Sequence, residues 1–196
     1  MEDKEKKKVV IVGNQQEVSR VVREMAKEGE ILRDTSQEGD YPLVPGRRLV
    51  TVPNPLLRQV CKPVGEIDAY VRGVVKDLQD WLGRPVQVGA QQSLCIGMSA
   101  PQLGELIRVY VVRLQGIDWV VINPEVVKSK GKQVVGETCE SIPGEVFYIE
   151  RAETFKVRAL DLDGNQRGYK GHGLLAAVLQ HEFDHLDGIM IDKKEK

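Results

Sequence analysis

Two histidines and a glutamate lie close together in the segment QHEFDH, residues 180–185. His181 and His185 are four residues apart, so on a helix both imidazoles face the same side, one turn apart. Two such imidazoles can bind one divalent cation, and Glu182 beside them can reach a water on that cation. The alternative is a pair of core histidines that form hydrogen bonds with the backbone. We favour the metal, because three buried polar groups without partners would cost several kcal/mol.

The surrounding sequence, LLAAVLQHEFDHL, predicts a helix that ends near Asp187 and is followed by a left-handed cap at Gly188. The two histidines and Glu182 share the buried face of this helix with its apolar residues, whereas Gln180 and Asp184 fall on the far side. The groups that could bind a metal are therefore expected to face the core.

A catalytic metal needs a third protein ligand and an open position for water. A zinc endopeptidase of the extended HExxH type has a further histidine that would fall at Ile191, and only eleven residues follow His185. The third ligand is therefore expected upstream. Cys139, in the stretch GETCESIPG, is the best candidate because a thiolate binds first-row metals strongly. Glu137 and Glu140 are the alternative ligands.

Composition and charge restrict the class of protein. The 196 residues fit one domain with an appendage, and 28 basic against 29 acidic side chains give a net charge of −1. We therefore expect no direct nucleic acid binding and no membrane binding. The three cysteines form no disulfide framework, and no apolar run reaches the roughly 20 residues that cross a bilayer. Because MEDKEKKK is no signal peptide, we expect a soluble cytoplasmic protein, with an organellar matrix as the alternative location.

Two parts of the chain differ in their pattern. Residues 1–46 combine a short strand (VVIVG, 9–13), an amphipathic helix over about 16–27 and a polar linker, and we interpret them as an N-terminal extension. Residues 47–196 contain a predicted helix over 68–82 and the segments IRVYVV, DWVVINP and TFKVRALDLDGN, which are typical of strands. Helices and strands are segregated more than alternated, which favours an α+β fold.

Three stretches together resemble the peptide deformylases: CIGMSAPQLG (95–104), ETCES (137–141) and QHEFDHLDG (180–188). The resemblance covers about residues 47–196 and is far more specific than HExxH alone. It implies an α+β domain with mixed, mostly antiparallel sheets around a central C-terminal HExxH helix. It also implies a metal-dependent amide hydrolase that removes the N-terminal formyl group from formyl-methionine of nascent polypeptides and releases formate.

The resemblance also assigns roles to individual residues. Its metal, typically Fe²⁺ with Zn²⁺ or Ni²⁺ as substitutes, would be held by Cys139, His181 and His185. Glu182 would act as the acid and base of the reaction, and Gln102 would donate a hydrogen bond to the oxyanion. The backbone N–H of Glu140 would be a second donor to the same oxyanion.

A substrate groove follows from the same resemblance. Ile96 and Gly97 would pair with the peptide backbone in the manner of a strand, and the missing side chain of Gly97 would let the two main chains approach closely. Val135, Leu174 and Val178 would line the pocket for the methionine side chain. A turn glycine and ordinary core residues are the alternatives at these positions.

The motifs depart from the usual wording of the family at Cys95, Thr138 and Glu140. A deformylase-like binding protein without turnover is therefore an alternative function. Retention of Gln102 and Glu182, together with all three metal ligands, favours an enzyme, because a binding protein has no evident need for this set. The nascent-chain substrate also implies that the protein works near the ribosome.

Overall fold

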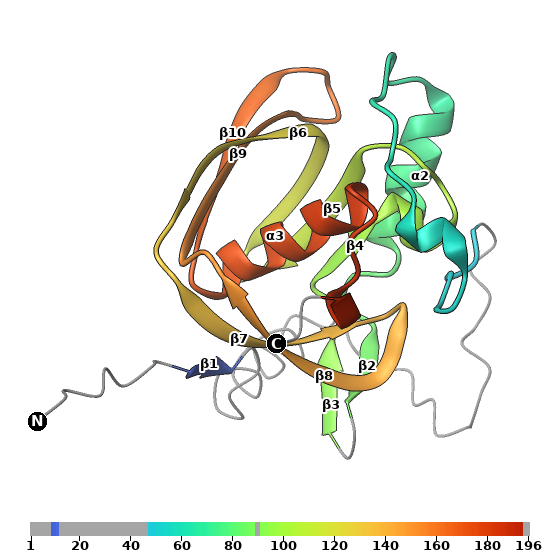
Figure 1. The fold of residues 1–196 in the computed structure, drawn as a ribbon. Coiled ribbons are helices and arrows are strands. Elements are labelled where there is room, and N and C mark those ends of the chain that lie inside the picture. The colour runs from blue at the N-terminus through green and yellow to red at the C-terminus, as the bar shows by residue number, and fades with distance from the viewer. Residues whose placement is uncertain (1–8, 12–46, 89–90, 194–196) are drawn as a thin grey trace, which may run out of the picture.

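The computed structural model describes residues 9–11, 47–88 and 91–193 (Figure 1). Within these ranges the chain forms the α+β fold that the sequence predicts, and the short predicted strand near the N-terminus is present at 9–11. The predicted helix at 16–27 and the linker up to residue 46 lie outside the described residues. The division of the chain at residue 46 therefore stays a prediction.

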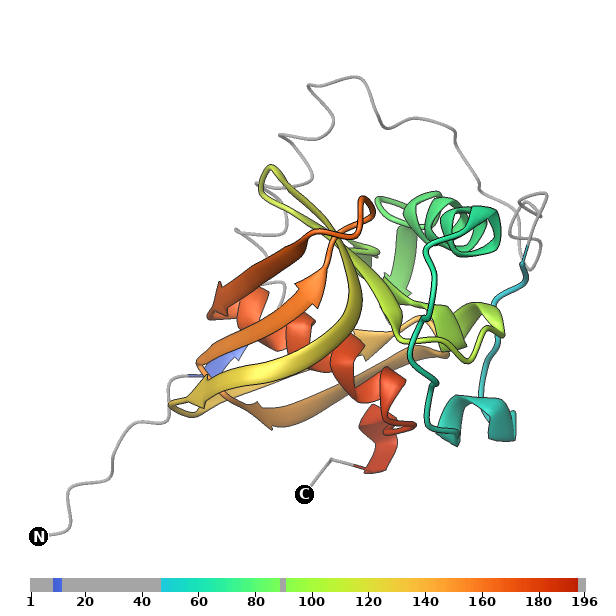
Figure 2. The same ribbon diagram turned by 90° about the horizontal axis from the view of Figure 1, so that it is seen from above.

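A curved five-stranded sheet wraps around the C-terminal helix α3 (Figures 1 and 2). The strand order is β10-β9-β6-β5-β4, and all neighbouring strands are antiparallel. This arrangement confirms the predicted antiparallel sheet around a central helix. The bounds are β4 Gly97–Ser99, β5 Val109–Leu114, β6 Ile117–Lys130, β9 Thr154–Leu160, β10 Gln166–His172 and α3 Leu174–Leu186.

The alternation of residues along β9 explains why this sheet faces α3. Phe155, Val157 and Ala159 are buried in one apolar cluster with the buried residues of α3. Lys156 and Arg158 lie between them and point to the other face, because successive side chains of a strand alternate. The helix therefore lies in a core, as its apolar pattern predicts.

A second sheet carries the cysteine motif. It contains β7 (Gln133–Cys139) and β8 (Ile142–Arg151) as an antiparallel pair, and β1 (Val9–Ile11) lies parallel to β7. The pairing of β7 with β8 shifts between Glu137 and Cys139, as in a β-bulge. Neither β7 nor β8 was predicted from the sequence. The end of β7 lies in ETCES, a polar stretch that lacks the apolar alternation of a typical strand.

Helix α2 (Ala69–Gln79) packs against β4 and β5 with its apolar face. It begins after Asp68, whose side chain accepts an N-cap hydrogen bond from the Val71 N–H (2.9 Å). This helix confirms the prediction over 68–82, although it is shorter. No helix in the described ranges is long and apolar enough to span a membrane. The remaining elements are β2 Pro85–Val88, β3 Gln91–Leu94, η1 Pro55–Arg58, η2 Ala100–Leu103 and η3 Ile191–Lys193.

Gly171 in β10 lets α3 pack directly against the sheet. A Cβ atom at this position would lie 2.6 Å from the backbone nitrogen of Ala176, so the backbone would have to move. We expect Gly171→Ala to lower the free energy of unfolding by about 1–3 kcal/mol, because overpacking strains a dense core. Urea unfolding followed by circular dichroism measures this difference.

Gly168→Ala in the same strand is the matched control. A Cβ atom there would meet only the flexible end of the Lys156 side chain, with Cε at 3.3 Å. We expect a loss of unfolding free energy no greater than about 0.5 kcal/mol for this variant. Equal losses in the two variants would contradict the packing argument.

Candidate metal centre and active site

The two histidines of α3 face each other inside the protein. The Nε2 atoms of His181 and His185 are 3.2 Å apart, and the two rings meet edge to face at 79°. Their exposed fractions are only 8% and 1%, which confirms that this side of the helix is buried. Burial also lowers the pKa of His185 well below its usual value, so its ring is neutral and suited to bind a metal.

Cys139 reaches the same point from the end of β7. Its Sγ atom lies 3.4 Å from Nε2 of His185 and is buried. In the described part of the chain, Cys139, His181 and His185 are the group whose ligand atoms come together, all within 4.8 Å of one another. One thiolate and two imidazole nitrogens suit Fe²⁺, Zn²⁺ or Ni²⁺, whereas Ca²⁺ and Mg²⁺ prefer oxygen ligands. The donor set therefore fits a first-row transition metal.

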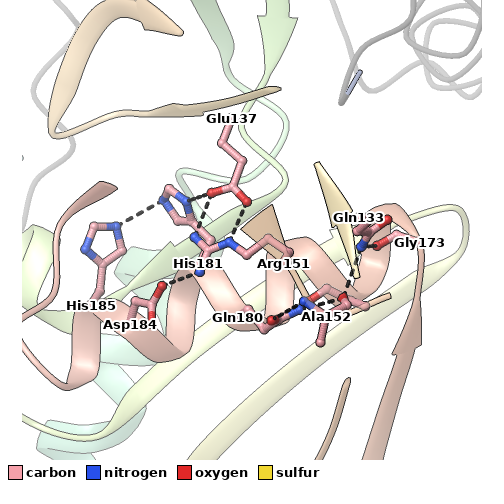
Figure 3. A network of polar contacts seen from close by, with 10 residues as sticks. Gln133, Glu137, Arg151, Ala152, Gly173, Gln180, His181, Asp184 and His185 are labelled. Atoms are coloured by element: carbon pink, nitrogen blue, oxygen red, sulfur yellow. Dashed lines mark hydrogen bonds and ion pairs between the residues drawn. The ribbon is translucent and has the colours of Figure 1, made fainter. Parts of the chain in front are cut away.

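Glu137 orients His181 and is not part of this group of ligand atoms. Its Oε2 atom lies 2.9 Å from Nδ1 of His181, and Arg151 donates two hydrogen bonds of 2.7 and 2.8 Å to the same carboxylate (Figure 3). Because an ionised carboxylate only accepts, Nδ1 carries the proton and Nε2 keeps its lone pair for a metal. Burial opposes ionisation, yet these hydrogen bonds outweigh it and lower the pKa of Glu137 to about 2.

The other side of α3 is attached to the end of β8, so it does not simply face solvent. The side chain of Gln180 accepts a hydrogen bond from the backbone N–H of Ala152 and donates one to its carbonyl, both at 2.9 Å (Figure 3). Asp184 accepts a hydrogen bond from Arg151. The two residues that the helical wheel puts on the far side therefore fix the helix against the second sheet.

Glu182 lies on α3 next to the two histidines and is 3% exposed. Burial raises the pKa of this carboxyl to about 7. Its Oε2 atom has no hydrogen-bond partner among the described residues. A carboxyl group with a pKa near neutrality and an unengaged oxygen is well suited to accept a proton and return it.

Gly97 makes room for this carboxylate. A Cβ atom at Gly97 would lie 2.4 Å from Oε1 of Glu182 and 3.0 Å from Cγ1 of Val178. Any other residue at this position of β4 would displace the glutamate. The family resemblance attributes this glycine to close approach of the substrate backbone, and the structure adds a second reason, the space that Glu182 occupies.

Gln102 in η2 directs its amide nitrogen toward the metal-binding group. Its Oε1 atom accepts hydrogen bonds from the backbone N–H and the hydroxyl of Ser99, both at 2.9 Å. This fixes the amide, so Nε2 donates to Ser141 Oγ at 3.4 Å and to Cys139 Sγ at 3.7 Å. Since Gln102 is 2% exposed, its N–H group is held in place without competition from bulk water.

The residues predicted to bind the substrate do not all lie together. Ile96, Leu174 and Val178 belong to the same apolar cluster beneath the five-stranded sheet. Val135 is fully buried in β7, on the second sheet. The carbonyl of Ile96 accepts a hydrogen bond from the Arg113 N–H (2.9 Å), which pairs it with the neighbouring strand. Binding of a methionine side chain by these residues stays a prediction.

Two of the unusual motif residues lie in buried surroundings. Glu140 follows Cys139 directly, and burial raises the pKa of its carboxyl to about 7 against the opposing charge of Arg84. The thiol of Cys95 donates to the carbonyl of Gly97 at 3.3 Å, and burial raises its pKa well above the usual value. Cys95 is therefore a core thiol and no activated nucleophile.

Three residues that hold the candidate site residues in place were not predicted from the sequence. Arg151 holds Glu137, while Ser99 and Ser141 contact Gln102. The two serines lie inside the recognised motifs, so their position could have drawn attention to them. No local pattern marks Arg151, because its carboxylate partners come from β7 and α3, which are distant in the sequence.

Comparisons with known proteins agree with this geometry. The family model for polypeptide deformylase matches residues 47–196. The peptide deformylase of Thermomicrobium roseum is 41% identical over 159 residues, which cover 76% of this chain and 86% of that protein. The peptide deformylase of Dictyoglomus thermophilum is 37% identical, with 74% and 90% covered. A crystal structure of a peptide deformylase from Legionella pneumophila has a TM-score of 0.67 at 31% identity, covering 77% of this chain and 86% of that chain.

These likenesses favour deformylation over both alternatives, the zinc endopeptidase and the binding protein without turnover. The match to the family model extends over residues 47–196, in which the three motifs lie. The chain therefore belongs to the polypeptide deformylase family, the metal-dependent hydrolases that remove the formyl group from the N-terminal methionine of new polypeptides.

Proposed function

We propose that Cys139, His181 and His185 hold one divalent metal ion and that deformylation of N-formylmethionyl nascent peptides takes place beside it. One observation carries the proposal, the convergence of a sulfur and two imidazole nitrogens within 4.8 Å of one another. Three protein ligands leave a catalytic metal one position for reactants. A cation held there polarises the formyl carbonyl and acidifies water.

Fe²⁺ is the proposed native metal, with Zn²⁺ or Ni²⁺ as substitutes. The mixed set of one thiolate and two imidazoles accepts all three ions, so the donor atoms alone do not select among them. A thiolate ligand donates charge, which makes a ferrous centre sensitive to oxidation. Rapid loss of activity in air is therefore expected for the iron form.

Glu182 carries the proton in the proposed reaction. Its carboxylate takes a proton from the attacking water and delivers it to the methionine nitrogen as the bond between carbonyl carbon and nitrogen breaks. The products are formate and a peptide with a free N-terminal amine. The pKa of about 7 for the Glu182 carboxyl supports this role, because both protonation states are then accessible near neutral pH.

Gln102 stabilises the negative charge that develops on the formyl oxygen. Its Nε2 donor is fixed by Ser99 on one side and lies 3.7 Å from the sulfur of Cys139 on the other. A donor that is already oriented costs no reorganisation during the reaction. The backbone N–H of Glu140, directly after the cysteine, is the proposed second donor.

The substrate is proposed to lie along β4. Ile96 and Gly97 pair with its backbone, and Val135, Leu174 and Val178 surround the methionine side chain. Chains that begin with formyl-methionine come from ribosomes in the cytoplasm or in an organellar matrix. We therefore infer that the enzyme works in such a compartment and near the ribosome.

Replacement of Glu182 tests the proton-transfer role. We expect Glu182→Gln to lower the rate of formate release from a formyl-Met peptide by about 10²–10⁴-fold, because general acid–base catalysis contributes that much. The metal content, measured by atomic emission, is expected to stay unchanged. Glu145→Gln, at an exposed position of β8, is the control and is expected to keep full activity. Normal turnover in Glu182→Gln would contradict the assignment.

Removal of the metal tests the ligand set. Dialysis against a chelator is expected to abolish formate release, and anaerobic addition of Fe²⁺ is expected to restore it. Cys139→Ser is expected to lose bound metal, whereas Cys61→Ser is expected to retain it because Cys61 is a core thiol in another cluster. Full turnover by protein shown to contain no metal would refute the proposed centre.

Gly97→Ala tests the space around Glu182. The added methyl group would overlap with Oε1 of the glutamate, and we expect formate release to fall at least about 100-fold, since small misplacements of a catalytic group cost that much. Metal content and folding are expected to be retained. The control is Gly136→Ala, where the nearest atom, in Tyr148, would be at an ordinary 3.4 Å. Unchanged kinetics in Gly97→Ala would show that the space at Gly97 is not needed to position Glu182.

A further inference from the structure

Three lysines lie directly opposite one another on the outer face of the five-stranded sheet. Lys128 of β6 is in register with Lys156 of β9, and Lys156 is in register with Lys170 of β10. We call these three residues the lysine row. Because neighbouring strands are about 4.8 Å apart, three ammonium-bearing side chains share a strip roughly 10 Å wide.

The lysine row takes part in no ion pair within the described ranges. Like charges that face each other directly destabilise a sheet. The next row of the same face is built differently, because Arg158 there forms an ion pair of 2.7 Å with Glu125 on the adjacent strand. The sheet therefore balances charge in one row and concentrates it in the next.

The surroundings of the lysine row are also basic and polar. The flanking rows are Glu125, Arg158 and Gly168 on one side and Lys130, Thr154 and His172 on the other. Of these nine positions, five carry a lysine or arginine and one carries an acid, and none carries an apolar side chain. The outer face is thus strongly positive in a chain whose net charge is −1.

The position of Lys156 depends on a glycine in the neighbouring strand. Its Cε and Nζ atoms lie 3.3 and 3.9 Å from the place where a Cβ atom of Gly168 would be. The aliphatic part of the lysine therefore lies over β10. This brings its ammonium group toward the strand that also carries Lys170.

We propose that the lysine row binds the phosphate backbone of double-helical RNA. Lysines neutralise phosphates without reading bases, and RNA duplexes are recognised mainly by shape and backbone contacts. Proteins that bind single strands stack bases on aromatic side chains, and helices that bind lipid insert apolar ones. The nine positions contain no Phe, Tyr or Trp on which bases could stack, and the exposed apolar side chains beside them on β6 are two small valines, Val126 and Val127, so the surface favours the duplex.

Binding of RNA at this face leaves the catalytic centre free. The curved sheet has α3 on its inner side (Figure 1). The lysine row lies on the opposite face, since Phe155 and Val157 beside Lys156 pack with residues of α3. The surface would hold the enzyme on an RNA-rich particle such as the ribosome while a substrate enters from the other side. The expectation of no nucleic acid binding rested on net charge, which does not report how charges are distributed.

The test uses the full chain and a fluorescently labelled RNA duplex of about 16 base pairs. Anisotropy titrations between about 50 and 200 mM salt give the affinity and its salt dependence. We expect the combined variant K128Q, K156Q and K170Q to bind at least about tenfold more weakly. We also expect the slope of log K against log salt to fall by about 2–3.

Two further variants control for net charge and for folding. K62Q, K76Q and K132Q together remove the same charge at exposed lysines elsewhere, and this variant is expected to bind within about twofold of the unmodified chain. K128R, K156R and K170R together keep the charge and are expected to retain binding. Formate release from a free formyl-Met peptide is expected to be the same in all variants, which separates this proposal from the proposed catalytic residues.

Several results would overturn the proposal. The first is an unmodified chain that does not bind the duplex. The second is an equal loss of affinity in the lysine-row variant and in the K62Q, K76Q and K132Q control. The third is failure of the K128R, K156R and K170R variant to bind. Tighter binding to phosphatidylserine vesicles than to RNA would replace the proposal by a lipid surface. Loss of formate release in the lysine-row variant would show that this face serves the active site or the fold instead.

Discussion

A carboxylate held between an arginine and an imidazole connects the second sheet to the helix that carries the two histidines. Glu137 of β7 accepts two hydrogen bonds from Arg151 of β8 and contacts His181 of α3 at 2.9 Å. Because Cys139 follows Glu137 on the same strand, this contact also determines where the sulfur meets the histidine rings. The Arg151 and Glu137 side chains are only 2% and 5% exposed, so loss of either partner would leave a buried charge without compensation. Orienting partners of this kind maintain metal ligands in other proteins as well.

Glu137 and Glu182 are both buried, yet the pKa values of their carboxyl groups shift in opposite directions. Glu182 forms no ion pair with any described residue, and desolvation raises its pKa to about 7. Glu137 is equally buried but bonded to Arg151, so its pKa falls to about 2. One carboxyl can therefore exchange a proton near neutral pH while the other stays ionised and holds His181. The division of labour between two glutamates follows from their partners, because both lie in the same low-dielectric surroundings.

The curved sheet separates two surfaces of different character. Its inner face packs against α3, and in its strand β4 Gly97 leaves space for the Glu182 side chain. Its outer face carries the lysine row, which forms no ion pair with the other described residues, whereas Arg158 in the adjacent row is paired with Glu125. Because alternate side chains of one strand serve the two faces, β9 contributes Val157 to the core and Lys156 to the surface. Catalysis and a charged surface can thus be built from the same strands without interfering.

The sequence by itself determined the faces of individual elements. The i, i+4 spacing placed His181 and His185 on the buried side of one helix, and the apolar pattern over 68–82 predicted α2, because both features depend on neighbours within a few residues. The family resemblance also named Cys139, which the structure brings to those histidines. Only the tertiary structure revealed that Cys139 ends a strand, that Arg151 bonds to Glu137 and Asp184, and that three lysines from separate strands share one row. Distances between such residues depend on how whole elements pair and pack, and no local pattern encodes them.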